Sequence, residues 1–197
     1  MYENDAMNVL HQTLWRTCRV LANPVRLRVL RHVCHEGEAC VSATARACCL
    51  PLSSATSALR ALQARGLLGV RREGLFVIYC AQADKSVEHA AAVLAAVRRA
   101  LDRRVANRRI IRAVTAFTHV RRILIVRALV AGAADAGALA VTCGVSLPAL
   151  YRHLAKLERR GMVEAVADGT RRLALPDGAL ARALLALVAP GQRPSVI

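Results

Sequence analysis

The sequence has few aromatic residues, few acidic residues and no hydrophobic run long enough to cross a bilayer. Aromatic residues make up 3% of the 197 residues, so we do not expect a core or ligand site built from stacked rings. No apolar stretch approaches the roughly 20 residues that a membrane-spanning helix needs. The N-terminus has no basic run followed by an apolar segment, so no secretory signal is expected. The seven cysteines are therefore expected to be reduced thiols in the cytoplasm.

Motifs for catalysis are also missing. The chain has no Gly-rich phosphate loop, no paired catalytic carboxylates and no Ser-His-Asp arrangement. We therefore do not expect an enzyme.

Basic residues, by contrast, are abundant. Lys and Arg number 29 against 13 Asp and Glu, which gives a formal net charge of +16, and only Lys85 and Lys156 among the basic residues are lysine. Arginine binds phosphate well because its planar guanidinium can contact two oxygens at once. The charge predicts a polyanionic partner such as nucleic acid or an anionic membrane surface.

The sequence repeats itself. Residues 11–31 align with residues 107–127 at a shift of 96, with Arg26 on Arg122 and Arg31 on Arg127. Residues 59–68 align with residues 154–163 at a shift of 95. Most of the matched positions are apolar or glycine, which is what a shared fold retains. The sequence predicts two domains, at residues 1–105 and 106–197.

Each copy shows the same order of elements. In the first copy we expect helices at 8–21, 25–35, 41–49 and 53–65, with Ser53 or Ser54 as the cap of the fourth. A hairpin turns at Glu73-Gly74 between strands 67–72 and 75–80, and a helix runs from 84 to about 105. In the second copy we expect helices at 107–117, 120–131, 135–143, 147–160 and 178–188, a hairpin at Asp168-Gly169, and Asn107 as a cap.

This order predicts a mainly α fold with small β-hairpin wings, as two tandem winged helix-turn-helix domains that form a pseudo-dimer. The recognition helices would be residues 53–65 and 147–160, and the wings 67–80 and 163–175. The first recognition helix should bury Ala55, Leu59 and Leu62, and the second Leu150, Leu154 and Leu157. The candidate DNA contacts are the polar residues on the other faces and on the wings: Ser53, Ser54, Thr56, Ser57, Arg60, Arg71, Arg72, Tyr151, Arg152, His153, Lys156, Arg171 and Arg172.

Three segments carry a family resemblance. LANPVRLRVLRHV at 21–33 and ALQARGLL at 61–68 are similar to the ArsR-type metalloregulators, and YRHLAKLERRGMV at 151–163 looks like their recognition helix. The resemblance implies cytoplasmic repression of an operator with release by a metal or another inducer. Family members are homodimers whose first and last helices pack together. Here one chain would supply both halves.

The cysteines leave three interpretations open. The family's metal motif has two cysteines one residue apart, but this chain has only Cys40 followed by Val41 and Ser42. Cys34, Cys48 and Cys49 could join Cys40 to bind a thiol-bound metal or metalloid inducer, with His35 nearby. They could also form a redox switch. The simplest interpretation is that they are small apolar core residues.

Taken together, the residues favour a cytoplasmic, sequence-specific repressor that binds double-stranded DNA, as a homodimer or a monomeric pseudo-dimer. One alternative is a tandem winged-helix scaffold that binds proteins, which would need no basic surface. Another is a nonspecific architectural nucleic-acid binder, since charge alone gives affinity without sequence preference. His32, His89, His119 and His153 are expected to stand apart from one another.

Overall fold

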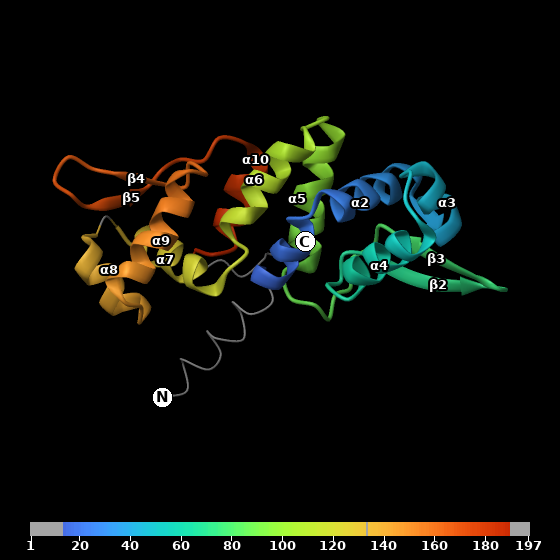
Figure 1. The fold of residues 1–197 in the computed structure, drawn as a ribbon, viewed down its shortest axis with the longest axis horizontal. Helices are drawn as coiled ribbons and strands as arrows, with labels where there is room; N and C mark the ends of the chain where they lie inside the picture. The colour runs from blue at the N-terminus through green and yellow to red at the C-terminus, as the bar shows by residue number, and fades with distance from the viewer. Residues whose placement is uncertain (1–13, 133, 190–197) are drawn as a thin grey trace.

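The structure is a computed structural model that describes residues 14–132 and 134–189. The molecule is elongated (Figure 1), with α2 to α4 and a hairpin at one end and α7 to α9 and a second hairpin at the other. Helices α5, α6 and α10 lie between the two ends. Within these ranges, no helix is both long and apolar enough to span a membrane.

The first set of elements begins with a helix over residues 14–21; the predicted residues 8–13 of this helix lie outside the described ranges. It continues with α2 (Pro24–Glu36), β1 (Glu38–Cys40), α3 (Val41–Ala47), α4 (Leu52–Gln63), β2 (Gly69–Glu73), β3 (Phe76–Cys80) and α5 (Ala90–Asp102). The strands form an antiparallel sheet in the order β1-β3-β2. Strand β1 is too short to have been predicted by alternation.

The second set repeats this order. It consists of α6 (Asn107–Ala116), α7 (Val120–Val130), α8 (Ala136–Cys143), α9 (Leu147–Glu158), β4 (Val163–Ala165), β5 (Arg171–Leu173) and α10 (Ala179–Ala186). Strands β4 and β5 pair antiparallel, and an isolated bridge joins Ala134 to Arg171 in the place that β1 takes in the first set. The bounds of these five helices agree with the prediction to within two residues at each end.

Hydrogen bonds recur at the same shifts as the sequence. Arg26 Nε donates to the carbonyl of Val20 at 2.7 Å, and Arg122 Nε donates to the carbonyl of Ala116, 96 residues further on, at 3.0 Å. Both arginines thereby satisfy carbonyls at the end of the preceding helix, which have no partner inside that helix. This explains why an arginine stands at the same place in both copies.

The start of the third helix also repeats. The Cys40 thiol accepts a hydrogen bond from the Ala43 N–H at 3.5 Å, and the Asp135 carboxylate accepts one from the Ala138 N–H at 2.9 Å, at a shift of 95. Both side chains thus cap their helix. The Cys40 side chain is thus positioned by its contact with the first turn of α3.

Three predicted details at helix ends are wrong. Helix α4 begins at Leu52, and its cap is Pro51, whose side chain offers no acceptor, so Ser53 and Ser54 lie inside the first turn. Helix α5 starts at residue 90, because the Asp84 carboxylate accepts hydrogen bonds from the N–H and hydroxyl of Ser86 in a turn that competes with the helix. Helix α6 is capped by Ala106, which makes no side-chain cap bond.

Asn107 instead links the two sets of elements. Its side-chain oxygen accepts hydrogen bonds from Arg31 Nε at 3.1 Å and Nη2 at 2.7 Å, and Arg31 Nη2 also donates to the Val105 carbonyl at 2.8 Å. Helix α10 packs on α5 and α6, and α2 packs on α6. The buried side chains of both sets form one continuous core cluster, so the two ends are joined through packed helices.

Candidate nucleic-acid interface

Helix α4 has one buried face and one polar face. Ala55, Leu59 and Leu62 are buried, as predicted. The opposite face exposes Ser53, Ser54, Ser57 and Arg60. Three of these side chains are short, so the exposed face of α4 can come close to the surface of a partner.

Thr56 differs from its neighbours because it is half-buried. Its hydroxyl donates to the carbonyl of Leu52 in the preceding turn at 2.7 Å. Inside helices, serine and threonine hydroxyls commonly donate a hydrogen bond to a backbone carbonyl of the preceding turn. The Thr56 hydroxyl is therefore less available than that of Ser57 for a hydrogen bond to a binding partner.

Helix α9 is built in the same way. Leu150, Leu154 and Leu157 are buried. Arg152 and Lys156 are exposed, and the Tyr151 side chain is half exposed with its phenol on the surface. The exposed groups here are larger and more cationic than those of α4, so the two helices present different chemistry.

His153 does not lie on this exposed face. It is half-buried, and its ring contacts that of His119, with the two ring centroids 4.7 Å apart and the ring planes tilted by 44°. His119 in turn caps α7 by accepting a hydrogen bond from the Arg121 N–H at 3.1 Å. The expectation that these two histidines stand apart is wrong, because α7 and α9 pack together and bring them into contact.

The surroundings of His153 favour its neutral form. Burial, together with the positive charge of the nearby His119, Arg122, Lys156 and Arg121, lowers the pKa of His153 to about 4. Burial and positive neighbours also lower the pKa of His119. A neutral, packed imidazole makes His153 part of the α7–α9 contact.

We expect this histidine to make stability depend on pH. The unfolded chain binds the proton near the ordinary histidine pKa of 6.5, while folded His153 binds it only near 4. Unfolding is therefore increasingly favoured as pH falls from 6.5 to 4. Urea unfolding at several pH values measures this loss, which His153→Leu should reduce. His35→Leu, at an exposed position, is the control, and equal slopes in both variants would contradict the assignment.

The two arginines of the first wing are exposed, and one of them is paired. Arg71 makes ion pairs of 2.7 Å with both Glu38 and Glu73. Surface ion pairs of this kind are weak because water screens the charges, so a phosphate could replace a carboxylate at little cost. Arg72 is exposed, and no ion pair to it is found within the described ranges.

The second wing has the same character. Arg171 is paired with Glu158 at 3.1 Å, and Arg172 with Glu164. Arg171 is more covered than the other three wing arginines, because it also takes part in the bridge with Ala134. Among the four, Arg72 is the most available to an outside anion.

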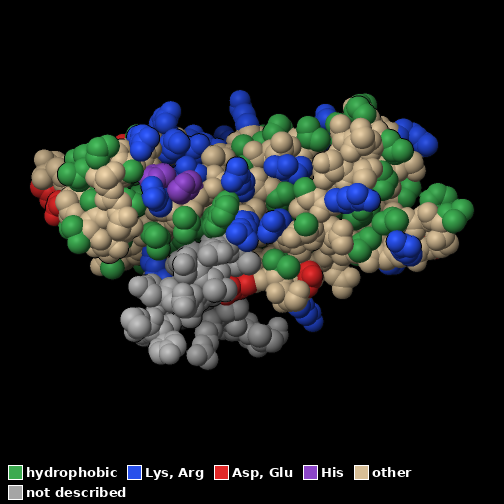
Figure 2. All heavy atoms as spheres, turned by 60° about the horizontal axis from the view of Figure 1, so that its bottom comes forward, with side chains coloured by type: hydrophobic (Ala, Val, Ile, Leu, Met, Phe, Trp, Pro, Cys, Tyr) green, Lys and Arg blue, Asp and Glu red, His purple; other side chains and the backbone are tan. Residues whose placement is uncertain are grey.

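Basic side chains extend beyond these elements. Figure 2 shows Lys and Arg side chains along the whole length of one face, with few acidic side chains among them. An open hollow next to α9 is lined almost wholly by cations: Arg108, Arg112, Lys156, Arg159 and Arg160, with Ile111 and Thr115. The positive charge is thus concentrated beside α9 and α6.

The four candidate cysteines do not form a metal cluster. In the part of the chain that the structure describes, no three His, Cys, Asp or Glu side chains are placed to hold a metal ion together. Cys48 is buried and its thiol faces the Arg28 carbonyl at 3.9 Å, Cys34 is half-buried and Cys49 is exposed. Cys49 adopts a positive φ of 49°, where the second copy has Gly144 with φ 58°.

The thiols differ in reactivity. Burial raises the pKa of Cys34 to about 11 and also raises those of Cys48 and Cys18, while hydrogen bonds from Ser42 and from the Ala43 N–H lower the pKa of Cys40. Because the thiolate is the nucleophile, Cys40 should react faster than these three. Iodoacetamide labelling of the folded protein, read by peptide mass spectrometry, should modify Cys40 and the exposed Cys49 first and Cys18 last. Early labelling of Cys18 or Cys48 would contradict this order.

Sequence reasoning missed two features. One is the role of the buried Arg122: the alignment matched it with Arg26, but did not reveal that its side chain hydrogen-bonds to carbonyls at the end of the preceding helix. The other is a cavity between α5, α6 and α10, lined by arginines from separate segments. The Arg-Arg pairs at 98/99, 103/104 and 108/109 are the available sequence signal for this cavity.

Solved structures similar to this chain include the two below, while no family model and no curated protein matches it. One is the solution structure of the homodimeric winged helix-turn-helix DNA-binding domain (fragment 1–100) of Mb0332 from Mycobacterium bovis, described as a possible ArsR-family transcriptional regulator. It is 32% identical over 51% of this chain and 89% of that chain, with a TM-score of 0.42. The other is reduced HlyU from Vibrio cholerae, which is 24% identical over 54% of this chain and 96% of that chain, with a TM-score of 0.36.

Each of these alignments covers about half of this chain. The fold itself is evident from the elements described above. Helices α2, α3 and α4 are followed by the β2–β3 hairpin, and α7, α8 and α9 by the β4–β5 hairpin. This mainly helical arrangement with small antiparallel sheets is the winged helix-turn-helix fold.

Proposed function

We propose that this chain is a sequence-specific transcriptional regulator of the ArsR type, a repressor that reads double-stranded DNA with α4 and α9. In a winged helix-turn-helix, the helix before the hairpin enters the major groove and its exposed side chains reach base edges. The observation that carries the proposal is that both α4 and α9 leave a polar face uncovered beside a hairpin with arginines. The net charge of +16 supplies the attraction to phosphate.

We further propose that the chain divides into domains at residues 1–105 and 106–197, which together act as a pseudo-dimer. The hydrogen bonds of Arg26 and Arg122, and the caps at Cys40 and Asp135, recur at the shifts found in the sequence and support two copies of one unit. The packing of α10 on α5 and α6 supports a joint formed inside one chain.

In this proposal the two ends have distinct roles in recognition. Ser57 and Arg60 of α4 and Tyr151, Arg152 and Lys156 of α9 contact bases. Ser53 and Ser54 lie in the first turn of α4, close enough to its N-terminal N–H groups to join them in contacting a phosphate. Arg72 contacts phosphate directly, while Arg71, Arg171 and Arg172 do so after leaving their carboxylates.

The test is a selection of bound duplexes from a random pool in about 150 mM salt, where nonspecific electrostatic binding is weakened. The proposal predicts enrichment of a defined sequence, bound at least 1,000-fold more tightly than random duplex, which is roughly the lower end for specific regulators. Tight binding without enrichment would instead identify an architectural binder. Absence of binding would favour a scaffold for proteins.

A further inference from the structure

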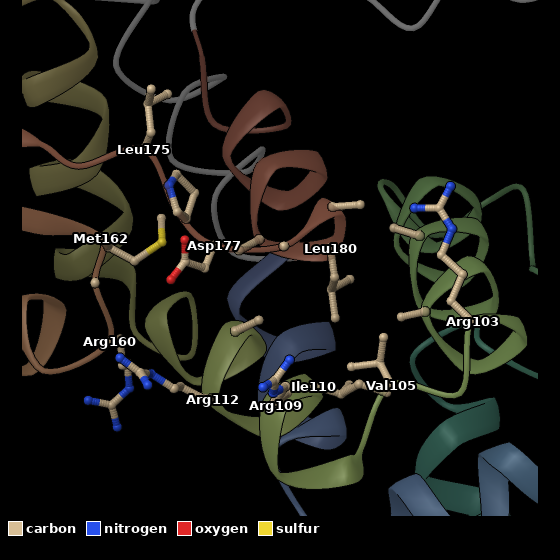
Figure 3. A pocket seen from close by; sticks show the side chains of 18 of the residues that line it. Arg103, Val105, Arg109, Ile110, Arg112, Arg160, Met162, Leu175, Asp177 and Leu180 are labelled. Atoms are coloured by element: carbon tan, nitrogen blue, oxygen red, sulfur yellow. The ribbon is translucent and has the colours of Figure 1, made fainter.

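A cavity of about 640 Å³ lies at the joint between the two sets of elements. Its walls come from α5, from the start of α6, from the turn at residues 160–162 and from the segment that leads into α10. Figure 3 shows side chains from all of these segments around one space. Cavities of roughly 300–1,000 Å³ are the size in which small organic ligands bind.

The body of the cavity is apolar. Val105, Ile110, Met162, Leu175 and Leu180 line it, together with several alanines. Ile110 and Met162 are buried in the core, so their positions are fixed by packing. This wall suits the hydrocarbon part of a ligand.

The charged lining is strongly one-sided. Five arginines line the cavity, and among the described residues Asp177 is the one carboxylate that lines it. The arginines come from α5, from the bend after it, from α6 and from the turn after α9: Arg99, Arg103, Arg109, Arg112 and Arg160. Within the described ranges, no carboxylate lies close enough to any of the five to form an ion pair. Arg109, Arg112 and Arg160 lie along one side, and Arg103 stands on another (Figure 3).

One of these arginines has an unsatisfied buried donor. Arg160 Nη1 donates to the Lys156 carbonyl at 2.7 Å, but its Nε is buried and has no hydrogen-bond partner. Leaving a buried donor unpaired is unfavourable, and the neighbouring like charge of Arg112 adds to this. An anion bound between Arg112 and Arg160 would offset the repulsion between these two like charges.

We propose that this cavity binds a small organic anion, with an apolar body and a carboxylate or phosphate head. The head would lie against Arg109, Arg112 and Arg160, and the body would pack on Val105, Leu175 and Leu180. A nucleic-acid duplex does not fit this role, since its phosphates lie on a wide polar surface and it has no hydrocarbon to fill the apolar space. Binding here requires no DNA, so it is independent of the proposed function.

The experiment is isothermal titration calorimetry on the full chain with octanoate, octyl phosphate and octanol. The first two share the anionic head on an apolar chain and distinguish carboxylate from phosphate, while octanol is the neutral match. We expect at least one of the two anions to bind at least tenfold more tightly than octanol. Equal affinity for octanol and both anions, or no binding of any of the three, would overturn the proposal.

Two variants locate the site. The double variant Arg109→Gln, Arg112→Gln should weaken anion binding at least tenfold, and Arg28→Gln, Arg98→Gln is its control, since both pairs are exposed and the control pair lies outside the cavity. Ala179→Trp, at an exposed position that lines the cavity at the start of α10, should obstruct the apolar space and abolish binding. Equal binding by the arginine variant and its control would contradict the site.

Discussion

Arg152→Ala is expected to lower the affinity for the selected sequence by about 1–3 kcal/mol while changing the affinity for random duplex far less. Arg152 is exposed on α9, next to Tyr151 and on the face opposite Leu150 and Leu154. A guanidinium in this position can bind two acceptors on the edge of a guanine. Competition binding with both duplexes, at one fixed salt concentration, measures the two affinities.

The matched control is Arg72→Ala on the first wing. Arg72 is also exposed, but a wing contacts phosphate, which carries no base sequence. This variant should weaken binding to both duplexes equally and lower the slope of log affinity against log salt by about one unit. If the two variants behave alike, α9 does not read bases.

Arg122→Met is expected to destabilise the folded protein by about 2–4 kcal/mol, because it removes charged hydrogen bonds that each contribute about 1.5–3 kcal/mol and overlap in effect. Arg122 is only 6% exposed. It donates to the carbonyls of Ala116 and Thr115, each at 3.0 Å, and to the hydroxyl of Thr118. Methionine keeps much of the volume, so the lost hydrogen bonds dominate.

The corresponding variant in the first copy is the comparison. Arg26 donates to Val20 at 2.7 Å and to Arg19 at 3.5 Å, and it is half-buried. Arg26 makes fewer side-chain hydrogen bonds, and they are more accessible to water. Arg26→Met should therefore lower the free energy of unfolding by only about 1 kcal/mol. Urea unfolding of both variants measures the difference. A larger loss for Arg26→Met would show that burial does not set the strength of this contact.

The sequence predicted the local elements well because local signals determine them. Apolar periodicity placed α7, α8 and α9, and Gly66 and Gly161, both at positive φ, lie just after the helices that precede the hairpins. The exposed and buried faces of α4 and α9 followed from the same periodicity. Because the two halves of the sequence align, an element predicted in one half also predicted the corresponding element in the other.

The remaining features depend on contacts between distant segments. The His119–His153 contact joins the cap of α7 to a residue of α9, and no spacing rule connects the two. Asn107 looked like a cap from its position, but its side chain is occupied by Arg31, 76 residues away. The arginines of the cavity meet only because the chain bends at residues 103–106, where Arg104 adopts a positive φ of 55°.

The partners of the wing arginines could not be predicted from the sequence either. Four arginines in two Arg-Arg pairs were expected to be free for phosphate, yet Arg71, Arg171 and Arg172 are held by carboxylates of neighbouring strands and of α9. These carboxylates are placed by strand register and by packing. Sequence spacing alone does not reveal them.

The asymmetry of the bound DNA tests the central claim most directly. Residues 53–57 of α4 and 148–152 of α9 differ at every position, so the two helices cannot read the same bases. A footprint of the selected duplex, combined with light scattering of the complex, gives the site and the number of chains. We predict one chain on two unlike half-sites about 34 Å apart, or two chains on a longer site that is palindromic as a whole. A short, perfect palindrome bound by one chain would contradict the account.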